Sequence, residues 1–457
     1  MRVAAYMQNG PELAFLLFGT WKLGAVPVTV SGLYNARELA SSVEKTAPDL
    51  VVTDDHDLVA LSGLDGLDVP VRVFGEVDGF DSFPEGVDEP WEEAALDPDD
   101  EVAIVFTGGT TGLPKAVSVT YGGVSSSLDR LARVSKGRPG PYAIAPAAAA
   151  PNLVALPLFH SGGQHTLLFA LRVGRAPVLL SRFSAPTLAR LLERHRFDSL
   201  FLLPTMLYDV VHADAPIDMS SVRSVLVAGQ ALSIHLRRQF EEKFRIPILM
   251  NYGSTETGHV AGWTSSDMKA GLWKPGSAGR VYDDVELEIR DDDGNALPVG
   301  EPGEVCVRFT MAKGYIDDPE ATSELVQDGW THSGDIGYVD EDGVLFLVGR
   351  KRDMIKCGGF QVWPEEIEEE IRANPLVRDV RVLGVPHERL GEIPRAVVVR
   401  EPGDDPTDDE LAAALIELCR ERLAHFKAPR EVVFVPELPR SAAGKVQRHA
   451  IETGGVE

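Results

Sequence analysis

A run of glycine and hydroxyl side chains follows the apolar stretch 102–106. It consists of Thr107, Gly108, Gly109, Thr110, Thr111 and Gly112, and Lys115 comes three residues later. Glycines let backbone N–H groups approach an anion, hydroxyls donate further hydrogen bonds and a lysine adds charge, so this composition suits phosphate binding. The spacing of P-loop NTPases is not met, because Pro114 falls where their second glycine belongs. The loop alone leaves a phosphate site and a plain turn open.

The composition indicates a folded protein of more than one domain. Its 457 residues exceed what one core usually organises, and 44% are hydrophobic. Lys and Arg number 44 against 70 Asp and Glu, a formal charge of −26, which argues against nucleic-acid binding. Cys306, Cys357 and Cys419 form neither a disulfide framework nor a metal-binding spacing, so we expect a reducing, cytoplasmic location. The sequence predicts no transmembrane helix and no signal peptide.

The predicted secondary structure that must position this loop differs between successive segments of the chain. Up to about residue 255, short apolar runs alternate with helix patterns, which is typical of parallel sheets flanked by helices. One predicted helix spans 11–23, and another spans 35–46 with a capping-box start of Asn35 and Glu38. From about 276 apolar and polar residues alternate, as in antiparallel strands. A small α+β domain is predicted from about 353 to the end.

Five segments, in this order, resemble the signature motifs of the adenylate-forming superfamily of acyl-CoA synthetases, aryl-CoA ligases, luciferases and peptide-synthetase adenylation domains. They are the loop at 107–115, MNYGSTETGH at 250–259, THSGDIG at 331–337, GRKRDMIKCGGFQVWPEEIE at 349–368 and LPRSAAGKVQR at 438–448. The resemblance implies an α/β fold with a large N-terminal domain at 1–351, built of helix-flanked parallel sheets plus a distorted β-barrel. The β-rich part is expected at about 276–349, and a small mobile α+β lid at 353–457.

The resemblance assigns nucleotide contacts. The loop at 107–115 would hold the β- and γ-phosphates of ATP, although the family usually has serine in place of Gly108 and glycine in place of Ala116. Thr255 would donate to the α-phosphate, Glu256 would hold Mg²⁺, and Asp335 would accept both ribose hydroxyls. Further nucleotide contacts are expected from Gly229, Gln230, Ala231, Asn251, Tyr252, Gly253 and Arg350, with Tyr252 stacking on adenine.

The same resemblance assigns the acid and the lid. Lys445 would bridge the attacking carboxylate and the α-phosphate, which makes it a catalytic residue together with Thr255 and Glu256. Arg352 would be the hinge, and Gly358 and Gly359 would face the pantetheine tunnel of coenzyme A. His160 stands where amino-acid-activating members usually have aspartate, so we expect it near the pocket of an acid without an α-ammonium group.

The motifs together predict an AMP-forming acid–CoA ligase that uses ATP, Mg²⁺, coenzyme A and a small-molecule carboxylic acid, with a fatty acid slightly preferred over an aryl acid. Two alternatives stay open: an acyl-AMP ligase that loads an acyl carrier protein, and a catalytically impaired nucleotide-binding homologue. The sequence also leaves open whether the chain forms a homodimer. Its N-terminus starts later than is usual for the family, so we expect exposed apolar surface near the helix at 11–23.

Overall fold

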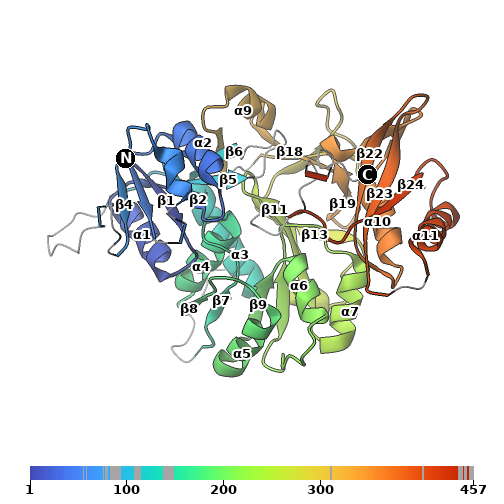
Figure 1. Ribbon diagram of the computed structural model, residues 1–457, viewed down its shortest axis with the longest axis horizontal. Coiled ribbons are helices and arrows are strands. Elements are labelled where there is room, and N and C mark those ends of the chain that lie inside the picture. The colour runs from blue at the N-terminus through green and yellow to red at the C-terminus, as the bar shows by residue number, and fades with distance from the viewer. Residues whose placement is uncertain are drawn as a thin grey trace.

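The computed structural model describes residues 1–54, 56, 57, 59–75, 77, 81, 82, 94–107, 115–136, 149–308, 311–403, 406–440, 446, 450 and 451, and of 133–136 the backbone only. Strands alternate with helices, and the predicted α/β fold class is confirmed. Figure 1 shows the N-terminal elements at one end of the long axis and the C-terminal elements at the other.

A seven-stranded sheet forms the N-terminal end, in the order β16-β6-β5-β2-β1-β3-β4. Its strands are β1 (Arg2–Met7), β2 (Val26–Ser31), β3 (Leu50–Thr53), β4 (Val71–Val73), β5 (Glu101–Thr107), β6 (Lys115–Thr120) and β16 (Ala312–Tyr315). The first five run parallel, whereas β6 and β16 each run antiparallel to their neighbour. Alternate residues of β1 pack on opposite faces, Tyr6 towards α2 (Ala36–Thr46) and Met7 towards α1 (Pro11–Lys22).

A ten-stranded sheet forms the middle of the molecule. β9 (Ser199–Leu202), β10 (Ser224–Val227) and β11 (Ile248–Ser254) are parallel. The remaining strands are antiparallel: β12 (Gly258–Gly262), β13 (Ser277–Val281), β14 (Leu287–Arg290), β15 (Gly303–Val307), β17 (Val326–Gln327), β18 (Trp330–Val339) and β19 (Val344–Arg350). A separate parallel pair joins β7 (Asn152–Val154) to β8 (Pro177–Leu179).

Helices cover these sheets and supply the main cores. They are α3 (Tyr121–Lys136), α4 (Ser161–Arg172), α5 (Ala185–His195), α6 (Pro204–Val211), α7 (Ile234–Phe244), α8 (Ser265–Lys269), α9 (Pro319–Leu325) and the 3₁₀ turn at Ala60–Leu64. Leu188, Leu207 and Phe240 of α5, α6 and α7 are fully buried in one cluster against β9, β10 and β11. This packing fixes the carboxyl end of that parallel group, where β11 leads into β12.

The C-terminal part has its own sheet and core. β20 (Ile355–Cys357), β21 (Phe360–Val362), β22 (Val377–His387), β23 (Gly391–Arg400) and β24 (Glu431–Phe434) pack with α10 (Pro364–Arg372) and α11 (Asp408–Arg422). Among the described residues, hydrogen bonds join it to the rest of the protein. Tyr208 Oη donates to Glu401 Oε1 at 3.1 Å, and Ile234 N donates to Glu369 Oε1 at 2.9 Å.

The structure tests two local predictions near the N-terminus. Asn35 and Glu38 form the predicted capping box at the start of α2. On α1, Leu13 and Leu17 are buried, whereas Phe15 is 72% exposed. Leu23, which directly follows this helix, is also exposed. The predicted apolar surface near this helix is therefore present in the structure.

Candidate functional site

Lys115 lies where the predicted phosphate loop returns to the sheet. Thr107 ends β5, Lys115 begins β6, and Thr107 Oγ1 donates to the Lys115 carbonyl oxygen at 3.5 Å. Lys115 Nζ lies 3.8 Å from Asp318 Oδ2 and 4.8 Å from the centre of the Tyr315 ring. A partly exposed ion pair at this distance is weak, so the lysine can turn towards a phosphate at little cost. The loop residues Gly108, Gly109, Thr110, Thr111 and Gly112 lie outside the described residues.

Glu256 is tied to the same edge of the N-terminal sheet. Tyr315 Oη donates to Glu256 Oε1 at 3.2 Å, and the Met311 N–H donates to the Glu256 carbonyl oxygen at 2.9 Å. Burial, and then the nearby Glu256 charge, raises the pKa of Tyr315 well above its usual value, so the phenol remains a neutral donor. One tyrosine thus separates the carboxylate expected to hold a metal from the lysine expected to hold phosphate.

The donor set near Glu256 fits Mg²⁺ that arrives with a nucleotide. Within the described residues, no group of three or more His, Cys, Asp or Glu side chains is arranged to hold a metal ion. Mg²⁺ takes most of its ligands from phosphate and water and commonly only one or two carboxylates from the protein, so a larger cluster is not required. Glu256, which shares Tyr315 with Lys115, offers one carboxylate of this kind.

Thr255 is buried where β11 turns into β12, and its Oγ1 lies 2.8 Å from Ser161 Oγ at the start of α4. The turn is tight: a Cβ on Gly253 would meet the Gly258 carbonyl oxygen at 1.9 Å, so this position requires glycine. The hydroxyl expected at the α-phosphate is therefore held by two elements.

Three of the predicted residues meet directly. Tyr252 Oη donates to Asp335 Oδ2 at 2.7 Å, and Arg350 Nε lies 2.8 Å from Asp335 Oδ1. Asp335 is buried, and its N–H donates to Ser333 Oγ at 3.1 Å. Burial, followed by the Asp335 charge, raises the pKa of Tyr252 far above its usual value. Each carboxylate oxygen has a further lone pair, so Asp335 can still accept hydroxyl groups from a ligand.

The segment Gly229, Gln230 and Ala231 follows β10, whose parallel neighbour is β11. Val227 pairs with Met250, so this segment and Tyr252 lie at the same edge of the sheet. Gly229 has φ of +84°, which favours glycine. Gln230 Nε2 is buried and has no hydrogen-bond partner among the described residues. It is a buried donor at the edge where a nucleobase is expected.

His160 occupies the N-cap of α4, where its Nδ1 accepts the Gly162 N–H at 3.1 Å. The sequence did not point to a polar row nearby. Asn251 Nδ2 donates to Tyr282 Oη at 2.7 Å, and Asn251 Oδ1 lies 2.6 Å from His259 Nδ1. Burial lowers the pKa of His259 to about 3, and neighbouring His165 and Arg130 act in the same direction. Asn251 and His259 lie in the motif at 250–259, and Asn251 is a predicted nucleotide contact, but spacing does not predict their contacts with each other and with Tyr282, because the fold brings these side chains together.

The structure places the predicted hinge and the two lid glycines after β19. Arg352 belongs to the 3₁₀ turn Lys351–Asp353 directly after β19. Gly358 and Gly359 form the turn between β20 and β21 with φ of +60° and +88°, and both are exposed. Such φ values explain the glycines. Lys445 lies outside the described residues.

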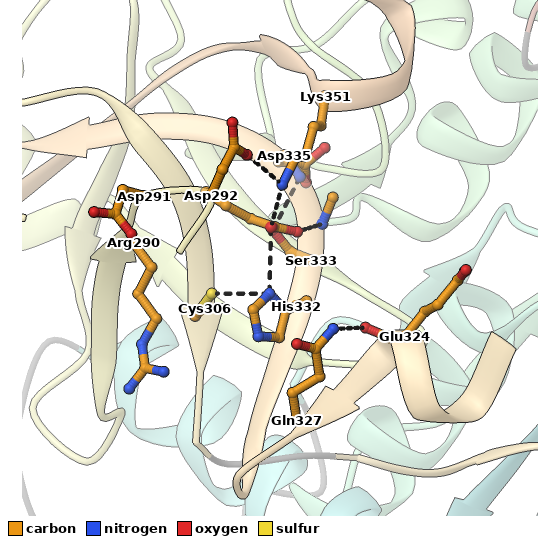
Figure 2. A network of polar contacts seen from close by, with 12 residues as sticks. Arg290, Asp291, Asp292, Cys306, Glu324, Gln327, His332, Ser333, Asp335 and Lys351 are labelled. Carbon is orange, nitrogen blue, oxygen red and sulfur yellow. Dashed lines mark hydrogen bonds and ion pairs between the residues drawn. The ribbon is translucent and has the colours of Figure 1, made fainter. Parts of the chain in front are cut away.

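A second polar network, which the sequence did not reveal, lies next to Asp335 (Figure 2). Buried Glu304 on β15 accepts the Gly334 N–H through Oε1 at 3.1 Å. Its Oε2 lies 3.2 Å from both Lys351 Nζ and His332 Nδ1. Lys351 Nζ also lies 2.9 Å from Asp292 Oδ1. The network joins the turn before Asp335 to the residue before Arg352.

Known proteins are similar to this chain over nearly its whole length. The family described as AMP-binding enzyme matches residues 1–316, and the AMP-binding enzyme C-terminal domain matches residues 366–445. The curated relative 4-coumarate–CoA ligase 5 of Oryza sativa subsp. japonica is 33% identical, over 98% of this chain and 83% of its own length. No helix within the described residues is both long and apolar enough to cross a membrane.

Two solved structures show the same fold over nearly the whole chain. An anthranilate CoA ligase in complex with anthranoyl-AMP aligns with a TM-score of 0.87 and 25% identity, over 99% of this chain and 87% of that chain. An amide bond synthetase from Marinactinospora thermotolerans aligns with a TM-score of 0.84 and 29% identity, over 99% and 89%. Because the first family match alone covers more than half of the residues, the protein belongs to the AMP-binding enzyme family, the adenylate-forming superfamily that its motifs resemble.

Proposed function

We propose that the protein is an acid–CoA ligase that converts a carboxylic acid, ATP and coenzyme A into acyl-CoA, AMP and pyrophosphate. The observation that carries this proposal is the contact of Tyr252 with Asp335, next to Arg350. It offers an aromatic ring for the base and a positioned carboxylate for the ribose hydroxyls of one nucleotide. The CoA ligases among the similar proteins support the thiol acceptor.

In the first half-reaction, a carboxylate oxygen of the acid attacks the α-phosphorus of ATP. The bond from that phosphorus to the oxygen bridging the β-phosphate breaks, and pyrophosphate leaves. Thr255 donates to the α-phosphate, while Lys115 and the loop at 107–112 hold the leaving group. Lys445 offsets the negative charge that builds between acid and phosphate. Glu256 would hold Mg²⁺, which would supply positive charge to the phosphate oxygens.

In the second half-reaction, the thiolate of coenzyme A attacks the acyl carbon, the carbon–oxygen bond to AMP breaks, and AMP leaves. We propose that residues 353–457 act as a lid that turns about Arg352 between the two steps and then presents Gly358 and Gly359 to the pantetheine arm. Both glycines are exposed, and their backbone leaves room for a thin ligand.

For the acid, we propose an aryl acid in preference to the fatty acid that the sequence slightly favoured. Two of the similar proteins are named for coumarate and anthranilate, which are aromatic acids.

A second candidate differs only in the acceptor, because the amide bond synthetase also shares the fold. In that reaction an amine would attack the acyl-AMP.

One experiment separates the two candidates. Acid-dependent exchange between ATP and pyrophosphate, measured with aryl and fatty acids, tests the first half-reaction. Adding coenzyme A or a panel of amines tests the second. No exchange with any acid would contradict both candidates, and exchange followed by amide but not thioester formation would select the second.

A further inference from the structure

The strand that carries Asp335 is interrupted opposite Glu304. β15 and β18 pair at Glu304–Ile336 and again at Cys306–His332, so three residues of β18 face a single residue of β15. Such a bulge turns a side chain out of the regular ladder and leaves backbone groups without a strand partner. Here the bulge contains Ser333, Gly334 and Asp335, with Gly334 at φ of +71°.

Glu304 replaces the missing ladder partner. Its Oε1 accepts the Gly334 N–H at 3.1 Å, directly before the residue that we assign to the ribose. The Glu304 side chain is 10% exposed, and a buried carboxylate is costly unless charged or polar partners surround it. Lys351 Nζ and His332 Nδ1, each 3.2 Å from Oε2, supply those partners.

Lys351 Nζ lies between the carboxylates of Glu304 and Asp292. Arg350, one residue earlier, pairs with Asp335, and Arg352, one residue later, is the assigned hinge. Asp335, within the bulge of β18, and Glu304, on the facing strand β15, therefore hold two consecutive cations at the end of β19, Arg350 and Lys351. The other partner of Lys351, Asp292, has a side chain that is 87% exposed and contributes little restraint.

We propose that Glu304 is a positioning residue that connects the ribose-binding turn to the lid hinge. One oxygen holds the turn that presents Asp335, and the other holds Lys351, so that the hinge begins at Arg352 and not earlier. The inference rests on the proposed function, in which Asp335 binds ribose and the lid turns between two half-reactions. This role adds no chemical step to the reaction. Glu304 and Lys351 keep the end of the hinge that adjoins residues 1–351 in place.

Three substitutions separate the two halves of this role. Glu304→Gln leaves Gly334 a neutral carbonyl in place of a carboxylate oxygen, which weakens that hydrogen bond, and places an amide N–H₂ group against Lys351, so both the turn and the hinge are disturbed. Lys351→Met keeps the aliphatic stem and removes only the hinge contact. Asp292→Asn is the matched control, because it neutralises the exposed partner of the same lysine. Each variant is assayed for ATP–pyrophosphate exchange, for thioester formation from supplied acyl-AMP and coenzyme A, and for overall turnover.

We expect Glu304→Gln to raise the KM for ATP in the exchange reaction about tenfold and to lower overall turnover. Lys351→Met should leave that KM unchanged and lower overall turnover about three- to tenfold, because only exchange between lid positions is disturbed. Asp292→Asn should match the wild type in all three assays.

Unchanged turnover in Lys351→Met would overturn the proposal. So would equal losses in every assay that track a lowered melting temperature. If the wild type forms no acyl-AMP, the proposed function fails, whereas wild-type activity with this pattern absent rejects only the role of Glu304.

Discussion

Asp335 and Arg350 are register partners on β18 and β19, and their side chains form an ion pair at 2.8 Å. The pairing follows from strand register, since Asp335 lies opposite Arg350 where the hairpin nears its open end. Tyr252 reaches the other carboxylate oxygen from β11. The charge of Asp335 is thus oriented before any nucleotide binds, which lowers the cost of positioning it during the reaction.

Asp335→Ala should weaken the use of ATP. The substitution removes the carboxylate that we propose as the acceptor for two ribose hydroxyls, and it leaves Tyr252 Oη and Arg350 without this partner. Each charge-assisted bond lost is worth about 1.5–3 kcal/mol, so kcat/KM for ATP should fall by at least about tenfold. Steady-state exchange between ATP and pyrophosphate measures this. An unchanged KM and kcat would rule out the ribose role.

Tyr252→Phe and Tyr252→Leu should differ in their effect on ATP binding. Phenylalanine keeps the ring and loses one charge-assisted hydrogen bond to Asp335, a change of about 1.5–3 kcal/mol. Leucine also removes the aromatic face, and base stacking is worth about a further 1–3 kcal/mol. Isothermal titration with a non-hydrolysable ATP analogue reports both values. If the two variants bind equally, the ring does not stack on the base.

The sequence predicted the elements better than the contacts between them. The capping box at Asn35 depends on residues three apart, and β11 depends on a short apolar run, so both could be read locally. The motif resemblance identified Tyr252 and Asp335. It could not show that they touch, because that contact depends on how β11 and β18 lie in one sheet.

Glu304 was missed for a related reason. Its partners lie 28, 30 and 47 positions away, and a bulge in β18 brings them into reach. A glutamate at the start of an alternating strand is ordinarily a solvated side chain on the exposed face. Only the burial of its carboxylate and the convergence of Gly334, His332 and Lys351 distinguish it.

Glu256→Gln should raise the Mg²⁺ concentration needed for half-maximal exchange activity about tenfold or more, because an amide is a far weaker ligand for a hard cation than a carboxylate. Tyr315→Phe removes only the hydrogen bond to Glu256 Oε1 and should shift the same midpoint by a smaller factor. A Mg²⁺ titration at saturating ATP measures both. Equal midpoints in the wild type and Glu256→Gln would place the metal elsewhere.

Lys445→Ala should reduce acyl-AMP formation from ATP by about a hundredfold or more, since it removes the positive charge that we propose to act where the acid meets the α-phosphate. Thioester formation from supplied acyl-AMP and coenzyme A should keep most of its rate. This second half-reaction is the internal control, because a damaged fold would slow both. Comparable losses in the two assays would argue against a role confined to the first step.

The stability of the protein should depend on His259 as the pH falls. Burial lowers the pKa of this imidazole to about 3, against 6.5 in an unfolded chain. At a pH below 6.5 the unfolded state therefore binds a proton that the folded state excludes, and the folded state loses stability until the pH reaches about 3. Above pH 6.5 the group is neutral in both states and contributes no pH dependence.

Between about pH 7.5 and about pH 5.5 this one histidine should cost on the order of 1 kcal/mol of unfolding free energy. Urea titrations of the wild type and His259→Gln at both pH values measure it, with His212→Gln at an exposed position as the control. The loss on acidification should be smaller in His259→Gln than in the wild type. If both lose the same free energy, His259 takes up its proton in the folded state and its burial does not exclude the charge.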